Sequence, residues 1–133
     1  MASKPESTFT RSILKHLPAT VYHMKNHNPY VGGIPDLWVS GNRGDAWIEM
    51  KFLPRVPQRA IVRPFTLLSE LQLKWLKGRY EEGRTVAVVV GCPDGGIILR
   101  DQEWEWEYDP QMFRDRLVPR KAIAQWITQI TTR

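Results

Sequence analysis

The chain has 133 residues, the usual length of one domain, and its 42% hydrophobic and 25% charged residues are typical of a globular protein. It contains no run of about 18 apolar residues that could span a membrane, and no apolar stretch follows its N-terminus, so we expect no signal peptide, no membrane partner and a cytoplasmic location. A single cysteine excludes an internal disulfide and a thiolate zinc cluster, whereas 19 Lys and Arg against 14 Asp and Glu give a net charge of +5, which favours a polyanionic partner.

The N-terminal part of the chain predicts a helix, a short strand and a loop. Apolar residues recur at helical spacing over residues 3–17, and Pro18 is expected to end that helix. Residues 20–25 are typical of a short strand, and residues 26–33 are rich in turn formers. His23 and His27 are four residues apart, but the turn formers beside them favour polar loop histidines over a metal pair.

A β-hairpin follows, and its register can be predicted. Residues 36–40 and 46–51 have the composition of strands, and Gly-Asn-Arg-Gly at 41–44 is turn chemistry. If the two glycines face each other, Asp36 lies directly opposite Glu49. Alternation along the strand then places Lys51 on the same face as Glu49, and the intervening apolar residues on the other face.

The second half of the chain predicts a loop, a helix, two strands and two further helices. Residues 51–64 carry four basic residues and no acid, and three prolines interrupt the loop at 53–64. Residues 69–80 predict an amphipathic helix whose apolar stripe includes Leu71 and Leu76. The remaining elements are strands at 85–90 and 97–100, a helix beginning at Asp109-Pro110 and a helix at 119–130.

The resulting order, roughly α-β-β-β-α-β-β-α, predicts one α/β domain of the α+β type over residues 1–133, with a central mixed sheet flanked by helices. Residues 101–109 hold five acids and no base. There Trp104 and Trp106 alternate with glutamates, and we predict an edge strand that forms a dimer contact or a solvated edge.

The opposed carboxylates of Asp36 and Glu49 predict a metal site. Two carboxylates whose Cβ atoms lie about 4.5–5.5 Å apart repel each other unless a cation lies between them. A hard divalent cation with oxygen ligands suits this position. Such a metal activates water and polarises a phosphoryl oxygen, and Lys51 can offset the charge that develops in the transition state. The alternative is a surface hairpin with solvated charges.

These residues resemble the motif of the PD-(D/E)xK nuclease superfamily. Gly-Ile-Pro-Asp-Leu at 33–37 and Trp-Ile-Glu-Met-Lys at 47–51 are similar to the motif in Holliday-junction resolvases and in the stand-alone VRR-NUC domains of phages. The resemblance implies a restriction-endonuclease-like core, dependence on Mg²⁺ or Mn²⁺, and often a homodimer. It implies that Asp36 and Glu49 are metal ligands, that the Met50 backbone carbonyl completes the metal shell, and that Lys51 is the catalytic lysine.

Two further residues are assigned to the site through the same resemblance. Glu6 occupies a helix in which many relatives place an acid that reaches the metal, although Ser3 and Glu6 also fit a capping box. Gln72 resembles a second-helix glutamine that approaches the site, although Ser69 and Gln72 fit a capping box too. In VRR-NUC domains this helix follows the lysine closely, whereas about 17 residues intervene here.

The basic loop at 53–64 is predicted to contact DNA phosphates. We assign five residues to DNA binding: Arg43, Arg55, Arg59, Arg63 and Lys74.

The sequence therefore predicts an Mg²⁺- or Mn²⁺-dependent deoxyribonuclease that cuts branched DNA as a homodimer, like a Holliday-junction resolvase. It would work in the host cytoplasm if a phage encodes it. The alternatives are a nuclease for flaps, ends or single strands on the same fold, and a DNA-binding module without activity.

Overall fold

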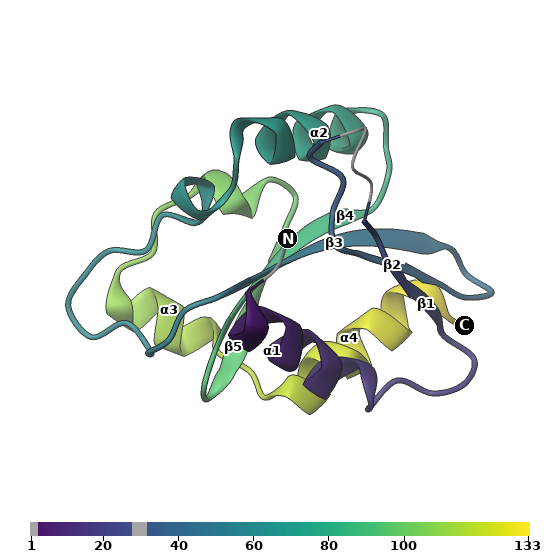
Figure 1. The fold of residues 1–133 in the computed structure, drawn as a ribbon, viewed down its shortest axis with the longest axis horizontal. Helices are drawn as coiled ribbons and strands as arrows, with labels where there is room; N and C mark the ends of the chain where they lie inside the picture. Colours follow the sequence, from purple (N-terminus) through teal and green to yellow (C-terminus); the bar gives the residue numbers. More distant parts are fainter. Residues whose placement is uncertain (1–2, 28–31) are drawn as a thin grey trace.

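A computed structural model describes residues 3–27 and 32–133, which fold around a five-stranded mixed sheet (Figure 1). The strands are β1 (Tyr22–Lys25), β2 (Leu37–Ser40), β3 (Asp45–Phe52), β4 (Val86–Cys92) and β5 (Gly95–Arg100). They lie side by side in chain order. Strands β3 and β4 are parallel, whereas the other neighbouring pairs are antiparallel. The predicted mixed sheet is confirmed.

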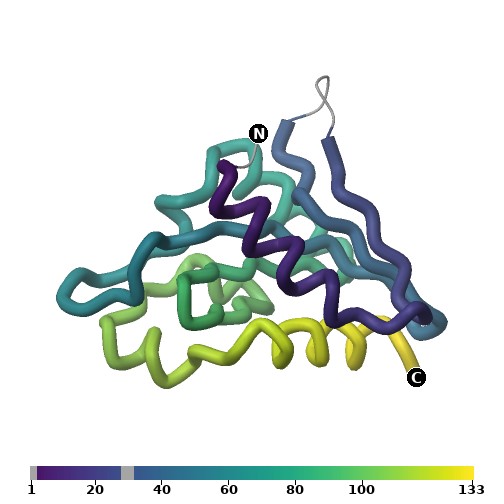
Figure 2. Tube along the Cα trace, turned by 60° about the horizontal axis from the view of Figure 1, so that its bottom comes forward, coloured from purple at the N-terminus to yellow at the C-terminus, as the bar shows by residue number. Residues whose placement is uncertain are grey.

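Helices cover both faces of this sheet (Figure 1). They are α1 (Lys4–Leu14), α2 (Glu70–Glu81), α3 (Pro110–Arg116) and α4 (Arg120–Thr131), with short 3₁₀ helices at Pro64–Leu67 and Glu103–Glu105. Helices α1 and α4 lie side by side on one face, and α2 lies on the other (Figures 1 and 2). Each face has its own apolar core, which includes Ile13 and Ile127 on the α1 and α4 side and Leu76 and Phe113 on the α2 side.

The alternation of β3 separates the two cores. Ala46, Ile48 and Met50 are fully buried on the face covered by α1 and α4, as predicted. Glu49 and Lys51 therefore project from the face that α2 covers. Strand β4 is buried along its whole length because it pairs on both edges and is covered on both faces, which explains its continuous apolar sequence.

Short polar residues fix where the helices begin. Ser3, Ser69 and Asp109 each accept a hydrogen bond from a backbone N–H in the first turn of α1, α2 and α3. At α2 the cap is reciprocal, because Gln72 also bonds back to the Ser69 backbone. The predicted helix starts are confirmed, while α1 ends at Leu14, before the expected boundary at residue 17.

The predicted edge strand over the acidic stretch is wrong. Asp101 and Gln102 adopt left-handed backbone conformations, with φ of 52° and 65°, so the chain turns back immediately after β5. The following 3₁₀ helix drives Trp104 into the core, where it is fully buried, while Trp106 remains 54% exposed. Leu71 also departs from the predicted stripe, because it is 57% exposed at the start of α2.

Within the described residues, no helix is long and apolar enough to cross a membrane.

Candidate active site

The β2–β3 hairpin has the register that the sequence predicts. Ser40 pairs with Asp45 and Leu37 pairs with Ile48. One further step in the same register places Asp36, immediately before β2, opposite Glu49 in the middle of β3. The two carboxylates therefore come from adjacent strands, at the end of the sheet where β2 begins.

Glu49 is the buried centre of this arrangement. Its side chain is 1% exposed, and in the described part of the chain neither carboxylate oxygen has a hydrogen-bond partner. The Nζ atom of Lys51 lies 3.9 Å from Glu49 Oε1, and the Lys51 side chain is 19% exposed. A buried carboxylate without hydrogen bonds is costly, so this position favours an added cation.

The electrostatics of Glu49 follow from this burial. Burial raises the pKa of the Glu49 carboxyl from 4.5 to about 9, and the neighbouring Asp36 carboxyl adds to the effect. Lys51 opposes the rise in pKa but does not cancel it. Without a metal the carboxyl therefore holds a proton near neutral pH, and a divalent cation would displace that proton on binding.

Glu6 lies within reach of the same charges. Ser3 Oγ accepts a hydrogen bond from the Glu6 backbone N–H at 3.3 Å, so the Ser3 half of the capping box is present. Burial raises the pKa of the Glu6 carboxyl, Lys51 lowers that pKa, and Asp36 raises it. The first turn of α1 thus brings a third acid towards the hairpin.

The backbone carbonyl of Met50 faces the side of β3 where β2 has ended. Trp47 and Leu53 donate their backbone N–H groups toward β4, so alternation turns the Met50 backbone groups the other way. Continued pairing would place Pro35 opposite Met50. Proline has no N–H to donate, so Pro35 leaves the Met50 carbonyl available to a cation.

Gln72 has a different position from the acids. Its Oε1 atom accepts the Ser69 backbone N–H at 2.9 Å, so this oxygen serves the cap of α2. The first turn of α2 nevertheless packs on the segment that leads to Asp36. A Cβ atom added to Gly33 would lie 2.4 Å from the Leu71 backbone oxygen.

The predicted DNA-binding residues lie outside this cluster. Arg43, in the β2–β3 turn, donates to the Gln129 carbonyl at 3.1 Å. This turn is far from Glu49, because the strand from Asp45 to Glu49 spans roughly 13 Å. Arg63 forms an ion pair with Glu107. The other three, Arg55, Arg59 and Lys74, are exposed.

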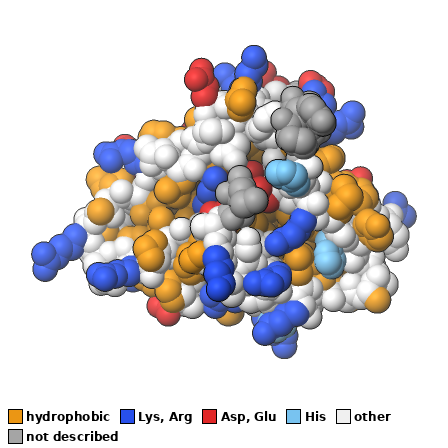
Figure 3. Space-filling model, in the orientation of Figure 1, with side chains coloured by type: hydrophobic (Ala, Val, Ile, Leu, Met, Phe, Trp, Pro, Cys, Tyr) orange, Lys and Arg blue, Asp and Glu red, His pale blue; other side chains and the backbone are white. Residues whose placement is uncertain are grey.

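A basic stripe on α1 was not singled out from the sequence. Lys4, Arg11 and Lys15 are exposed, and their spacings of seven and four residues place them along one side of the helix. Lys and Arg side chains gather over α1 in Figure 3, close to the acidic side chains near the middle of that face. The seven- and four-residue spacing in the sequence was the signal that could have identified this stripe.

The donor set fits a hard divalent cation such as Mg²⁺ or Mn²⁺. In residues 3–27 and 32–133, no cluster of three or more His, Cys, Asp or Glu side chains is arranged to hold a metal. The site offers instead the carboxylates of Asp36 and Glu49, and the Met50 carbonyl. Oxygen ligands with several positions left to water are what Mg²⁺ commonly has in proteins.

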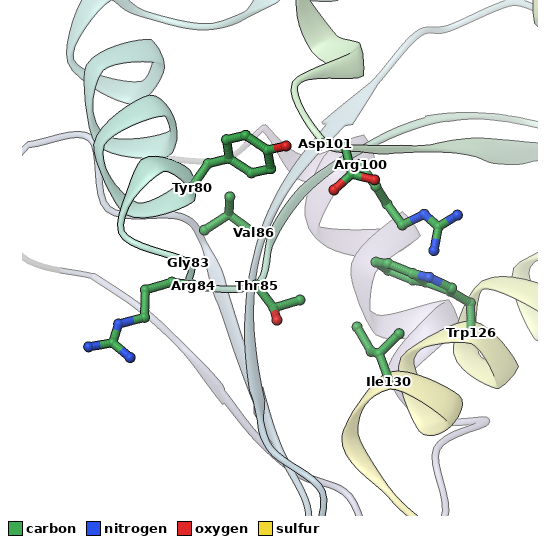
Figure 4. Close-up of a pocket in the computed structure, with 9 residues that line it drawn as sticks. All are labelled: Tyr80, Gly83, Arg84, Thr85, Val86, Arg100, Asp101, Trp126 and Ile130. Atoms are coloured by element: carbon green, nitrogen blue, oxygen red, sulfur yellow. The ribbon is translucent and has the colours of Figure 1, made fainter.

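A separate pocket of about 430 Å³ lies at the other end of the sheet (Figure 4). It lies between the C-terminal end of α2, the start of β4 and α4, and Tyr80, Arg84 and Trp126 line it. None of the acids of the hairpin reaches this pocket.

Comparison with known proteins identifies the fold. No protein-family model matches the chain, and no curated protein matches it. Among solved structures it is similar to Hjc, a Holliday junction resolvase from the archaeal hyperthermophile Archaeoglobus fulgidus, with a TM-score of 0.56 and 15% sequence identity. The likeness covers 94% of this chain and 99% of that chain. The chain therefore shares the overall fold of this resolvase, a mixed β-sheet flanked by helices, as predicted.

Proposed function

We propose that this protein is a metal-dependent deoxyribonuclease that hydrolyses phosphodiester bonds in branched DNA. The observation that carries the proposal is the buried Glu49 carboxyl, which has no hydrogen-bond partner among the described residues, lies opposite Asp36 and has Lys51 beside it. This set occupies the sheet of a resolvase-like fold. Structural ion pairs also perturb pKa values, but a buried acid that no described residue bonds has no evident structural use.

Each residue has a distinct role in this proposal. Asp36, Glu49 and the Met50 carbonyl hold Mg²⁺ or Mn²⁺, and Glu6 supports the ion from α1. The bound ion supplies a polarised phosphoryl oxygen and a more acidic water. Lys51, partly exposed and within 4 Å of Glu49, is placed to stabilise the negative charge that develops on the phosphate.

The same proposal includes a preference for branched DNA and assembly as a homodimer. Two strands must be cut to resolve a junction, and each chain offers one such site. A single domain of 133 residues also contacts only a small part of a four-way junction. The basic stripe of α1 and the exposed Arg55 and Arg59 supply positive charge for the phosphates.

The test is cleavage of a labelled four-way junction and a matched linear duplex with Mg²⁺, with Mn²⁺ and with EDTA. We expect metal-dependent cutting of the junction. Lys51→Ala should reduce the cleavage rate by about 10²–10³-fold while binding is retained, because an electrostatic stabiliser of the transition state is lost. Lys77→Ala changes an exposed lysine on α2 and serves as the control.

The other outcomes separate the alternatives. Equal cutting of both substrates would keep the nuclease and remove the preference for branched DNA. Cutting of flaps or single strands alone would favour a nuclease for those structures. Binding without cutting in either metal would identify a DNA-binding module.

A further inference from the structure

The chain that leaves β3 directly after the candidate site forms a projecting loop, residues 53–63, which we call the prong. The prong extends from the body of the molecule beyond the end of β3 (Figures 1 and 2). Two backbone hydrogen bonds, of 2.8 and 2.9 Å, join Val62 to Tyr108 at its base. Arg114 donates to the Pro57 carbonyl at 3.1 Å on its other arm. These contacts hold the prong in place before any partner arrives.

The two arms of the prong line an open cavity of about 320 Å³. Leu53, Pro54 and Pro57 line it from one arm, and Ile61 and Val62 line it from the other. Its volume is at the lower end of the range of about 300–1,000 Å³ that is usual for small-molecule sites. Its described lining contains no aromatic side chain. Ile61 is 48% exposed, although isoleucine is among the residues most often buried in folded proteins.

The charge around the cavity indicates what it can hold. Arg55 and Arg63 lie in its wall, Arg59 is exposed on the same loop, and residues 51–64 contain no acid; the acidic stretch 101–109 meets the prong only at its base, through Val62 and Arg63. Arg63 is paired with Glu107, so Arg55 and Arg59 are the cations left for an anion. Lys and Arg side chains project at this end of the molecule in Figure 3. An apolar cavity rimmed by arginines suits the face of a flat ring that is joined to phosphates.

We propose that the prong cavity binds one unstacked nucleobase of a DNA strand, with Arg55 and Arg59 on the phosphates beside it. In a continuous duplex every base is stacked, and unstacking costs a few kcal/mol. Where strands branch, stacking is already interrupted and that cost is lower. The prong would thus select branched DNA over linear duplex, an inference that rests on the proposed nuclease function.

The test uses the fluorescence of 2-aminopurine, which rises when the base leaves the stack. The base is placed at the branch point of a four-way junction or in the middle of a duplex, and the protein is added in EDTA so that nothing is cut. We expect the fluorescence to rise on binding the junction but not the duplex. The rise should persist in the bound state because no aromatic ring in the described lining of the cavity can quench it.

Two variants change the cavity without touching the acids of the hairpin. Ile61→Ala removes its exposed wall, and Ala60→Trp fills it from an exposed position. Since apolar contacts in a pocket are typically worth about 10-fold or more in discrimination, each variant should weaken junction binding roughly 10-fold relative to duplex and remove the fluorescence rise. Met112→Ala, on α3 and 43% exposed, is the matched control and should change neither quantity.

Failure of this inference differs from failure of the nuclease proposal. Metal-dependent cutting without a fluorescence rise would overturn the nucleobase site and leave the nuclease standing. Loss of self-association in Ile61→Ala, with junction binding unchanged, would show that the prong contacts a second copy of the chain instead. A fluorescence rise without cutting would support the site and remove the nuclease.

Discussion

Glu49 is the residue whose environment conflicts most with its charge. Its two neighbours in β3 point to the opposite core, while Glu49 itself pairs with Val88 of β4 and has the partly exposed Lys51 beside it. Alternation predicted which face would carry Glu49 and Lys51, and turn symmetry predicted that Asp36 would face Glu49. How deeply Glu49 is buried could not be predicted, because burial depends on strands and helices that join the hairpin from distant parts of the sequence.

The raised pKa of Glu49 predicts how the stability of the metal-free protein changes with pH. The folded protein keeps the Glu49 proton up to about pH 9, whereas the unfolded chain releases it near pH 4.5. The unfolded state therefore binds fewer protons between these values, and the free energy of unfolding falls as the pH rises through this window. Glu49→Gln should remove this dependence and stabilise the protein by about 1–3 kcal/mol near pH 8 in EDTA.

Thermal unfolding at several pH values, in EDTA and in Mg²⁺, measures this effect. Mg²⁺ should raise the melting temperature of the wild type at pH 8 and leave that of Glu49→Gln almost unchanged. A wild type that is as stable at pH 8 as at pH 5 in EDTA would show that Glu49 is not buried as described.

Whether Glu6 and Gln72 cap a helix or belong to the site cannot be decided from the sequence. Both fit a capping box equally well in the sequence. In the structure Gln72 closes the box with Ser69, whereas Lys51 and Asp36 act on the Glu6 carboxyl. The difference lies in the tertiary position of each helix start, which local spacing does not contain.

At the scale of elements, the first turn of α2 supports the segment that carries Asp36. Gly33 has a φ of +87°, and a Cβ atom there would overlap the Leu71 carbonyl. Gly33→Ala should therefore destabilise the protein by about 1–3 kcal/mol and lower nuclease activity by displacing Asp36.

Gly83→Ala is the matched control for this substitution. Gly83 has a similar φ of +81°, but no described atom lies within 4 Å of the Cβ position. It should show the backbone cost alone, about 1–2 kcal/mol, with activity unchanged. Equal losses of stability and activity in both variants would contradict the contact between α2 and the Asp36 segment. Chemical denaturation and cleavage assays measure the two quantities.

The basic stripe of α1 makes a prediction about salt dependence. If Lys4, Arg11 and Lys15 each contact a phosphate, changing all three to glutamine should reduce the slope of log affinity against log salt by about three units. Arg43→Gln provides the contrast. The sequence assigns Arg43 to DNA binding, but its guanidinium is bonded to the C-terminal turn of α4, so we expect this variant to leave the slope unchanged. Fluorescence anisotropy over a series of salt concentrations measures the slope. An unchanged slope for the triple variant would remove α1 from the DNA path.

The elements themselves were largely predictable, with one instructive exception. Helices and strands followed from apolar periodicity and from Ser, Asp and Pro at the helix starts. The turn after β5 was missed because Asp101 and Gln102 adopt left-handed conformations without a glycine to indicate them. Without that turn, the alternation of tryptophan and glutamate fits an edge strand as well as the observed 3₁₀ helix.

At the scale of the whole molecule, one sheet pairs the β2–β3 hairpin with β4, a strand from a distant part of the sequence. A mixed sheet between helices was predictable from the order of the elements. The position of β4 beside β3 was not, because the sequence does not state which strands pair across the long crossover at 53–85. That pairing fixes the position of the prong, because the prong is the first segment of this crossover.

The same pairing has a consequence for the folding rate. Hairpins close early, whereas a parallel pair across a long crossover closes late. Glu49 is therefore solvated in the β2–β3 hairpin and loses water only when β4 and the helices join the hairpin. Ionising Glu49 should slow this late step, so the folding rate in EDTA should fall between pH 6 and pH 9 in the wild type but stay constant in Glu49→Gln. Stopped-flow refolding would show this, and a constant rate in both would place β4 docking after the barrier. The carboxylate that we expect to hold the metal would then also set how fast the chain reaches its native state.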